Sequence, residues 1–380
     1  MKKIQRYIGL DVHKDTTVIA VADEGREGEV RAYGTISSDL HAIERLLPKL
    51  QEDGAELHFA YEAGPTGFVL CRYLRKRKID CIVVAPSKMP VPSGRRQKTD
   101  RRDAELLARL LRAGELTAIH VPDAVDESIR DLGRTRADAV DDLTRAKQRL
   151  KSFLLHTGYH YQGKATWGEA HLRYLRGLTL PLPAHKAVLE EYLLALDQCI
   201  ERVSRLDDLL AAQVPQWCHY PAVKALMALR GFQLVAATVL VAEIGDIHRF
   251  AHPRDLMAFL GLVPHEHTTG DTRRVGAITK AGNVHARWML IETVQSALFP
   301  PKVTAALTLR QEGQSAAVKE LSWKVQTRLH KRGWHLTCRG VMKPKVIVAL
   351  AREMAGFVWA MLHLVTEPKP LPAGPVLRRA

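Results

Sequence analysis

The feature that most constrains the fold is a single carboxylate inside an apolar stretch near the N-terminus. Asp11 lies in the run of residues 7–12, within the letters IGLDVH, among residues that favour a β-strand. A charged group is costly to remove from water unless a hydrogen bond, an ion pair or a metal ion compensates it. The fold must therefore place something beside Asp11 that offsets its charge.

The first 121 residues predict an α/β domain. Strands are expected at residues 7–12, 16–22, 30–36, 57–62 and 81–85, and helices at residues 39–50, 67–77 and 100–112. The polar residues 13–15 separate the first two strands and predict a hairpin. Three early strands followed by alternating helix and strand is the element order of an RNase H-like (RuvC-like) domain, which we place at residues 1–121.

The remainder of the chain predicts helices. Residues 129–156 and 184–214 carry Leu and Val every three or four positions with charges between them, which is typical of long amphipathic helices. They would form an antiparallel pair or a dimerising coiled coil within residues 122–213. Residues 214–366 predict a mostly helical domain, and residues 367–380, rich in Pro, predict a disordered tail. The expected fold class is α/β plus α.

Three further carboxylates are candidates to join Asp11. Glu62 ends a predicted strand, and Asp100 and Asp103 are three residues apart at the start of a predicted helix, which places them on one face. Like charges packed closely require cations, and oxygen ligands select Mg²⁺ or Mn²⁺. Two such ions about 3.5–4 Å apart can serve phosphodiester chemistry. The alternative is that Asp100 merely caps its helix.

The charge balance indicates a polyanionic partner. The formal net charge is +15, and residues 297–380 hold fourteen Lys or Arg against four Glu. Basic side chains that neutralise phosphates release condensed counterions, which favours binding to nucleic acid. The five cysteines form no CxxC pair, which argues against a zinc site and suits a reducing cytosol. The sequence shows neither a signal peptide nor a run of about 18 uncharged apolar residues, so we expect no membrane partner.

Several stretches together resemble one family. They are IGLDVHK, YEAGPTG, VAPSKMPVPSGRRQKTDRRDAELLARLLRAGEL, FLGLVPHEHTTG, RRVGAITKAGNVHARWMLIE and KPKVIVALAREMAGFVWAM. In this order and spacing they resemble the DEDD-type transposases of the insertion-sequence 110 family, in its 1111 branch. The resemblance covers nearly the whole chain. It implies an RNase H-like domain, a coiled-coil segment and a C-terminal transposase domain.

The resemblance also implies a function. Asp11, Glu62, Asp100 and Asp103 would be the metal-binding acidic tetrad of a DNA transposase and recombinase. A structured non-coding RNA would pair with donor and target DNA, and the protein would act as a homo-oligomer (dimer or tetramer) in the bacterial cytoplasm, at the nucleoid.

One departure concerns the nucleophile. The family is expected to attack DNA with a serine that follows the GLxP motif, whereas this chain has no serine between Leu256 and Gln295. The corresponding letters are HTTG, so Thr268 or Thr269 is the candidate, because a threonine hydroxyl can also attack phosphorus. Thr279 is a weaker candidate. In the alternative, the threonines only form a turn and Ser296 or no residue acts.

Basic residues near both regions are candidate phosphate contacts. The first group lies beside the carboxylates, and the second forms a predicted loop that enters a helix near Asn283. They are Arg95, Arg96, Lys98, Arg101 and Arg102, then Arg273, Arg274 and Lys280. A solvated basic surface is the alternative for each. Two other functions remain open: a catalytically silent RNA- and DNA-binding remnant, and a metal-dependent junction-resolving nuclease.

Overall fold

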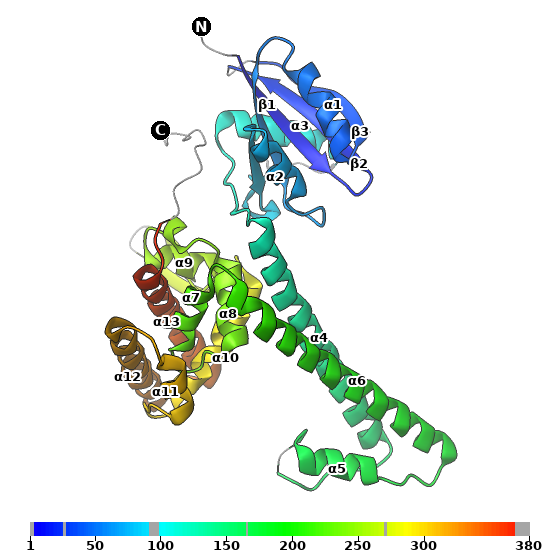
Figure 1. The fold of residues 1–380 in the computed structure, drawn as a ribbon, viewed down its shortest axis with the longest axis vertical. Coiled ribbons are helices and arrows are strands. Elements are labelled where there is room, and N and C mark those ends of the chain that lie inside the picture. The colour runs from blue at the N-terminus through cyan, green and yellow to red at the C-terminus, as the bar shows by residue number, and fades with distance from the viewer. Residues whose placement is uncertain (1–3, 26–27, 91–98, 165, 270–271, 369–380) are drawn as a thin grey trace. The chain divides into compact units, whose positions relative to one another are not determined.

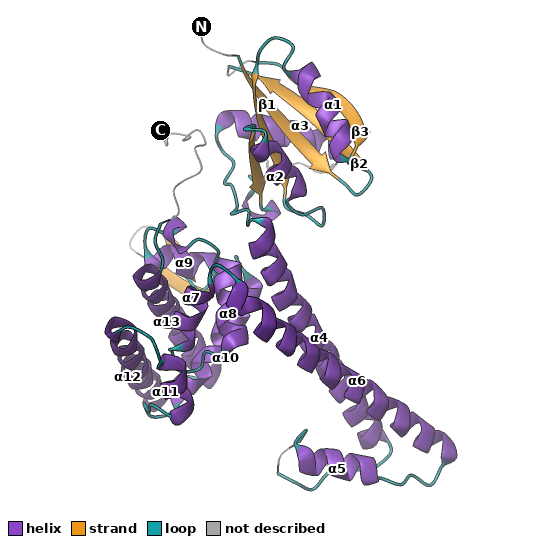
Figure 2. Ribbon diagram, in the orientation of Figure 1, coloured by secondary structure: helices purple, strands orange, loops and turns teal. Residues whose placement is uncertain are grey.

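The computed structural model describes residues 4–25, 28–90, 99–164, 166–269 and 272–368 (Figure 1). The chain forms two compact units, one that extends to Asp123 and one from Ala124 to Pro368. The first is a mixed α/β unit and the second is largely helical (Figure 2). The predicted fold class is confirmed at this level.

A five-stranded sheet forms the centre of the first unit, in the order β3-β2-β1-β4-β5. Its strands are β1 (Gln5–Val12), β2 (Thr16–Asp23), β3 (Val30–Ser37), β4 (Glu56–Glu62) and β5 (Asp80–Val84). β1, β2 and β3 pair antiparallel, whereas β4 runs parallel to β1 and β5 parallel to β4. β1 is therefore the central strand, and the strands lie where the apolar runs predict them.

Helices cover the two faces of this sheet. α1 (Leu40–Leu50) and α2 (Val69–Lys76) pack on one face, where Ile8, Leu10 and Phe59 belong to the main core. α3 (Asp100–Ala113) packs on the other face through small residues, among them Ala104 and Ala108 against Ala20 (Figure 1). A short 3-10 turn, η1 (Pro86–Lys88), follows β5. Small residues let α3 lie close to the strands.

Two long helices open the second unit and pack against each other. They are α4 (Ala124–His156) and α6 (Pro183–Gln213), with α5 (Glu169–Gly177) between them in sequence (Figure 2). Arg136 of α4 pairs with Asp207 of α6, and Asp142 of α4 pairs with Arg202 of α6. The residue numbers of the partners therefore rise along α4 as they fall along α6. The pair is therefore antiparallel within one chain, which is the first of the two arrangements that the sequence predicts.

The rest of the second unit is a helical domain with one hairpin. Its elements share a single hydrophobic core. They are η2 (Val214–Gln216), α7 (Tyr220–Met227), α8 (Leu234–Ile244), η3 (Ile247–Arg249), α9 (Pro253–Phe259), β6 (Pro264–Thr269), β7 (Thr272–Ile278), α10 (Val284–Val294), η4 (Gln295–Leu298), α11 (Ala305–Gln311), α12 (Ala316–Cys338) and α13 (Lys343–Val365). The sequence analysis did not predict β6 or β7.

One helix among the described residues has the length and composition to cross a membrane, namely α13. Half of the 18-residue apolar stretch within α13 is buried inside the protein. Val346, Leu350, Met354 and Met361 of α13 are almost fully buried in the core of the second unit. Its apolar character is accounted for by this packing.

Candidate functional site

The alternation of side chains along the strands places two of the four candidate carboxylates on the face covered by α3. Ile8 and Leu10 point into the core beneath α1 and α2, so Gly9 and Asp11 point to the opposite face. On β4, Phe59 and Tyr61 belong to the same core, which turns Glu62 toward α3. Leu10 pairs with Tyr61, and Asp11 and Glu62 are the next residue of each strand.

The other two acids reach this face because α3 begins there. Asp100 and Asp103 occupy its first turn, where the helix dipole favours negative charge. Gly9 makes this close packing possible, since a Cβ atom there would overlap the carbonyl oxygen of Ala104 and lie 2.5 Å from the nitrogen of Ala108. A larger residue at position 9 would therefore displace α3 from β1.

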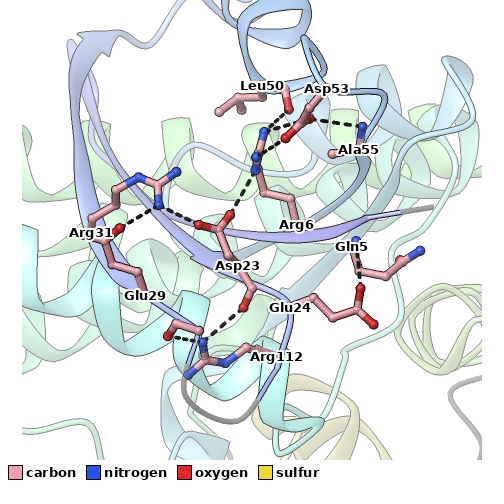
Figure 3. A network of polar contacts seen from close by, with 11 residues as sticks. Gln5, Arg6, Asp23, Glu24, Glu29, Arg31, Leu50, Asp53, Ala55 and Arg112 are labelled. Atoms are coloured by element: carbon pink, nitrogen blue, oxygen red, sulfur yellow. Dashed lines mark hydrogen bonds and ion pairs between the residues drawn. The ribbon is translucent and has the colours of Figure 1, made fainter. Parts of the chain in front are cut away.

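A polar network anchors the far end of α3 (Figure 3). Arg112, in the last turn, donates to the carbonyl oxygens of Asp23 (3.1 Å), at the end of β2, and of Gly28 (2.7 Å), shortly before β3. The Asp23 carboxylate accepts from Arg6 (3.2 Å) and Arg31 (2.6 Å), which ties β1, β2 and β3 together. Burial opposes the ionisation of Asp23, but the two arginines outweigh it and hold its pKa below the usual value. The network fixes α3 along the sheet.

Negative charge gathers at the start of α3. Burial, opposed by His13 and reinforced by Asp100 and Asp103, raises the pKa of Asp11 above its usual value. His13 lies in the β1–β2 turn, with its Nε2 atom 3.3 Å from Asp11 Oδ2 and 3.4 Å from Asp100 Oδ2. The sequence pattern predicts only a turn at His13. The one indication in the sequence that His13 could belong to the site is its position two residues after Asp11.

The donor atoms suit a divalent cation. One ligand atom from each of Asp11, His13 and Asp100 lies within 4.8 Å of the other two. Asp103 acts electrostatically on Asp11, and the strand register brings Glu62 to the same face. Burial and the neighbouring carboxylates raise the pKa of Asp11, and a bound cation would offset both by stabilising the ionised form. The residues present therefore fit such an ion.

The basic residues beside these acids divide into two sets. Arg101 and Arg102 are exposed in the first turn of α3, and Arg101 Nε donates to Glu105 Oε1 (3.0 Å). Arg95, Arg96 and Lys98 lie outside the described residues.

The two candidate threonines lie at the end of the hairpin formed by β6 and β7. In the antiparallel register, Thr268 pairs with Arg273 and Thr269 with Thr272. Arg273 and Arg274 therefore lie on a strand, which corrects the predicted loop. The letters TTGDT place Gly-Asp between threonines, a hairpin signal that the helical context obscured. Lys280 does lie in the loop before α10, which begins after its cap Asn283.

The base of the hairpin is held by α9 and α10. Arg287 Nη1 donates to the carbonyl oxygen of Leu260 (2.8 Å), and the Asn283 backbone N–H donates to that of Phe259 (2.8 Å). Where the chain enters and leaves the hairpin, the backbone N–H of Thr279 donates to the Val263 carbonyl oxygen and that of Lys280 to the Gly261 carbonyl oxygen. Both ends of the hairpin thus start from fixed backbone.

A buried ion pair connects this base to α4. Arg134 donates to both oxygens of Glu243 on α8, at 2.7 and 2.9 Å, and Asn283 Nδ2 donates to Oε2 at 2.7 Å. The Glu243 side chain is 1% exposed. Burial alone would raise the pKa of Glu243, but the hydrogen bonds from Arg134 and Asn283 outweigh it and hold the pKa below the usual value.

A second group of possible metal ligands consists of Asp126, Cys218 and His219. Asp126, in the first turn of α4, is buried and accepts a hydrogen bond from Trp217 Nε1 at 2.8 Å. His219 Nε2 lies 3.5 Å from the same oxygen, Oδ1. These contacts fasten the start of α4 to the loop before α7, and a structural role accounts for the group.

Comparisons with known proteins agree with the resemblance. Residues 8–158 match a family model described as "Transposase", of the DEDD type of insertion sequence 110, and residues 223–307 match "Transposase IS116/IS110/IS902 family". "Putative transposase y4qE" of Sinorhizobium fredii is 43% identical over 94% of this chain and 88% of its own length. "Transposase for insertion sequence element IS1533" of Leptospira borgpetersenii is 29% identical over 86% and 95%. "Transposase for insertion sequence element IS1111A" of Coxiella burnetii is 23% identical over 71% and 68%.

Proposed function

The chain belongs to the insertion-sequence 110 family of DEDD transposases, and from this premise we propose that Asp11, Glu62, Asp100 and Asp103 form the site that cuts and rejoins DNA. The observation that carries the proposal is the convergence of Asp11 and Asp100 on one side of the sheet, within reach of a shared cation. We further propose that the first unit, residues 1–121, is an RNase H-like (RuvC-like) domain. Its central β1, flanked by antiparallel β2 and parallel β4, supports that proposal.

The acidic residues would hold Mg²⁺ or Mn²⁺. Such an ion, when bound, polarises a phosphoryl oxygen and makes an attacking hydroxyl a better nucleophile. The carboxylates keep the ion on the face of the sheet covered by α3. Arg101 and Arg102, with Arg95, Arg96 and Lys98 from the segment before α3, would bind the flanking phosphates and offset the repulsion between DNA and the acids.

The second unit would supply the nucleophile, through the hydroxyl of Thr268 or Thr269. A bond forms between threonine Oγ and phosphorus while a P–O bond of the DNA backbone breaks. The Oγ proton passes to a base, and the expelled sugar oxygen gains a proton and leaves as a hydroxyl. A hydroxyl of the exchanging strand then attacks the same phosphorus and releases threonine. Because one phosphodiester replaces another, the exchange requires no ATP.

Further basic residues of the second unit would hold nucleic acid near the hairpin. Arg273 pairs with Thr268 and Arg274 with His267 along β6–β7, which supports a role in binding phosphates next to the threonines. Lys280 follows in the loop before α10. Residues 214–366 would then constitute the transposase domain, preceded by the helical segment 122–213 as a dimerisation element. The predicted tail, 367–380, lies outside the described residues from residue 369 onward.

A structured non-coding RNA from the insertion sequence is the proposed guide. The family resemblance and the net charge of +15 support binding of RNA together with donor and target DNA. We also propose that the protein acts as a dimer or tetramer at the nucleoid in the bacterial cytoplasm. Sequencing of the nucleic acid that copurifies with the full chain tests the guide: one defined RNA supports it, and only heterogeneous RNA contradicts it.

The nucleophile is tested by trapping a covalent adduct. The full chain is incubated with donor and target DNA, guide RNA and Mg²⁺, denatured, and digested for mass spectrometry of DNA-linked peptides. We expect the adduct on Thr268 or Thr269, its loss in the Ala variant of that residue, and its retention in the Ser variant. Thr327→Ala is the control and should retain it, because Thr327 lies on α12 and its hydroxyl donates only to carbonyl oxygens of that helix. Thr279→Ala tests the weaker candidate and should also retain the adduct.

The other outcomes of this experiment identify the rival functions. An adduct that persists in both Thr268→Ala and Thr269→Ala places the nucleophile elsewhere, with Thr279 as the next candidate and Ser296 after it. Cleavage that leaves free ends and is indifferent to both threonines indicates a junction-resolving nuclease. Binding without cleavage, under conditions where a serine-containing relative is active, indicates a catalytically silent remnant.

A further inference from the structure

His13 lies beside two of the candidate carboxylates, although the family tetrad does not include it. It lies where β1 turns into β2, and the backbone N–H of His13 donates to the Thr16 carbonyl oxygen (2.9 Å). This hydrogen bond closes a tight turn and holds position 13 just beyond the end of β1. The His13 side chain is about half exposed, at 48%, so it is accessible from solvent.

The position of the imidazole is determined from two elements at once. Its Nε2 atom is 3.3 Å from Asp11 Oδ2, on β1, and 3.4 Å from Asp100 Oδ2, at the start of α3. One nitrogen thus approaches two carboxylates that the fold brings together from distant parts of the sequence. A turn residue without a role at this site could occupy many other rotamers in solvent.

The distances from His13 Nε2 to the two carboxylate oxygens match those between neighbouring ligands around one metal ion. Adjacent ligands at about 2.1 Å from an ion are about 3.0 Å apart in an octahedron and about 3.4 Å apart in a tetrahedron. The two N···O distances of 3.3 and 3.4 Å fall close to this range. Small side-chain rotations would therefore suffice for all three to contact the same ion.

We propose that His13 supplies a nitrogen ligand to the divalent cation held by Asp11 and Asp100. The inference rests on the proposed function, because it concerns the same carboxylate site, and it adds a ligand that the acidic tetrad lacks. The ligand set is then mixed, with imidazole beside carboxylates. Imidazole suits transition metals, whereas Mg²⁺ takes oxygen ligands and water. The site accordingly prefers Mn²⁺ to Mg²⁺ by more than a site of carboxylates alone.

The proposal predicts a loss of metal selectivity when His13 is replaced. In His13→Gln the Mn²⁺ affinity falls by at least about tenfold, the lower end of what loss of a second-shell partner of a metal ligand costs. The Mg²⁺ affinity changes little, since a glutamine oxygen or a water molecule replaces the nitrogen. His41→Gln is the matched control, because His41 is 91% exposed on α1 and bonds only weakly with Glu44 at 3.8 Å.

Pulsed electron paramagnetic resonance of Mn²⁺ bound to the full chain tests the ligand without any measurement of activity. A coordinated imidazole nitrogen modulates the Mn²⁺ echo decay at ¹⁴N frequencies. We expect this modulation in the wild type and in His41→Gln, and its loss in His13→Gln. Mn²⁺ that binds to the wild type but shows no nitrogen modulation overturns the role of His13 and leaves the carboxylate site intact.

Asp11→Asn separates failure of this inference from failure of the proposed function. If Mn²⁺ binds the wild type and Asp11→Asn equally well, the ion is not held by the carboxylates, and both proposals are contradicted. If Asp11→Asn abolishes binding while His13→Gln changes neither the modulation nor the Mn²⁺ affinity, only the nitrogen ligand is wrong. Abolished binding in the first variant and lost modulation in the second together support the inference.

Discussion

Asp11 illustrates how a functional residue opposes the stability of the domain that carries it. Burial and the nearby charges of Asp100 and Asp103 raise its pKa, with only partial relief from His13. A carboxyl group whose pKa is higher in the folded state destabilises the fold at neutral pH, where it is ionised. The proposed function gives this charge a role that compensates for its cost to the fold.

This imbalance predicts the behaviour of Asp11→Asn. Without metal, we expect its unfolding temperature to equal that of the wild type or to exceed it by up to about 2 °C, because the substitution removes a partly buried charge and its repulsion by Asp100 and Asp103. With Mn²⁺, the wild type should gain stability by linkage to binding, and the variant should not. Differential scanning calorimetry with EDTA and with Mn²⁺ measures both, and an equal gain in both proteins would contradict the assignment of Asp11.

At the residue scale the sequence was informative where a side chain broke its local pattern. Asp11 stands out in an apolar strand, and the side-chain alternation places it opposite Ile8 and Leu10. His13 did not stand out, because a histidine in a polar turn is ordinary. Its relevance depends on the distance to Asp100, a residue of another element, and such a distance is not written in the local sequence.

At the scale of elements, the contact between β1 and α3 is what assembles the carboxylates. Gly9 lies against the backbone of α3 at Ala104 and Ala108, two residues before Asp11. α3 in turn carries Asp100 and Asp103 in its first turn. The distance between the two groups of acids therefore depends on the absence of a side chain at position 9.

Gly9→Ala should disturb both stability and the site. We expect a loss of about 1–3 kcal/mol in the free energy of unfolding, the usual cost of overpacking, because α3 must move away from β1. The Mn²⁺ affinity should also fall, as Asp100 moves with α3. Urea unfolding and metal titration measure the two effects. Gly64→Ala is the control, since a Cβ atom there meets nothing within 4 Å, and equal behaviour of both variants would contradict this account.

The Glu243 ion pair predicts a pH-dependent stability for the second unit. The pKa of Glu243 is lower in the folded state than in the unfolded state, so its ionised form stabilises the fold. This contribution to the free energy of unfolding is complete above the ordinary Glu pKa of about 4.3 and is lost as the pH falls through the pKa of the folded state. Glu243→Gln should lower the free energy of unfolding by about 2 kcal/mol at pH 7. This loss is smaller than that for breaking a fully buried ion pair, because the Arg134 side chain is 48% exposed.

Urea unfolding of the wild type and of Glu243→Gln from pH 7 to pH 3 tests this expectation. The difference in unfolding free energy should shrink as the pH falls below about 4.3, since the wild type then loses its own ion pair. The comparison cancels the contribution of the other carboxylates. A difference that stays constant across this range would show that the charge of Glu243 does not stabilise the unit.

Element prediction succeeded for long periodic segments and failed for the hairpin. The helices α4 and α6 follow from the spacing of Leu and Val. Their antiparallel pairing within one chain is one of the two arrangements that this pattern allows, and the sequence did not decide between them. β6 and β7 are short strands within a helical domain, with Thr and Arg at positions that also suit a loop. Cross-strand partners such as Thr268 and Arg273 become evident only once the register is known.

At the scale of the whole molecule, the proposed function assigns the chemistry to two units. The first gathers acids on one face of a sheet, and the backbone of the second carries the candidate residues Thr268 and Thr269 on a hairpin anchored by Asn283 and Arg287. The net charge of +15 belongs to the chain as a whole and favours the polyanions on which a transposase acts. Composition predicted this class of partner, whereas family resemblance was needed to specify DNA transposition.

The proposed function requires that the carboxylates of the first unit perform the DNA chemistry. The most direct test of this role compares recombination of donor and target DNA by the wild type, Asp11→Asn and Asp15→Asn, with guide RNA and Mg²⁺ or Mn²⁺. Asp15 is the matched control, an exposed acid in the β1–β2 turn. We predict product from the wild type and Asp15→Asn, and a loss of roughly 10³-fold or more for Asp11→Asn with DNA binding retained. Wild-type levels of product from Asp11→Asn would contradict the account.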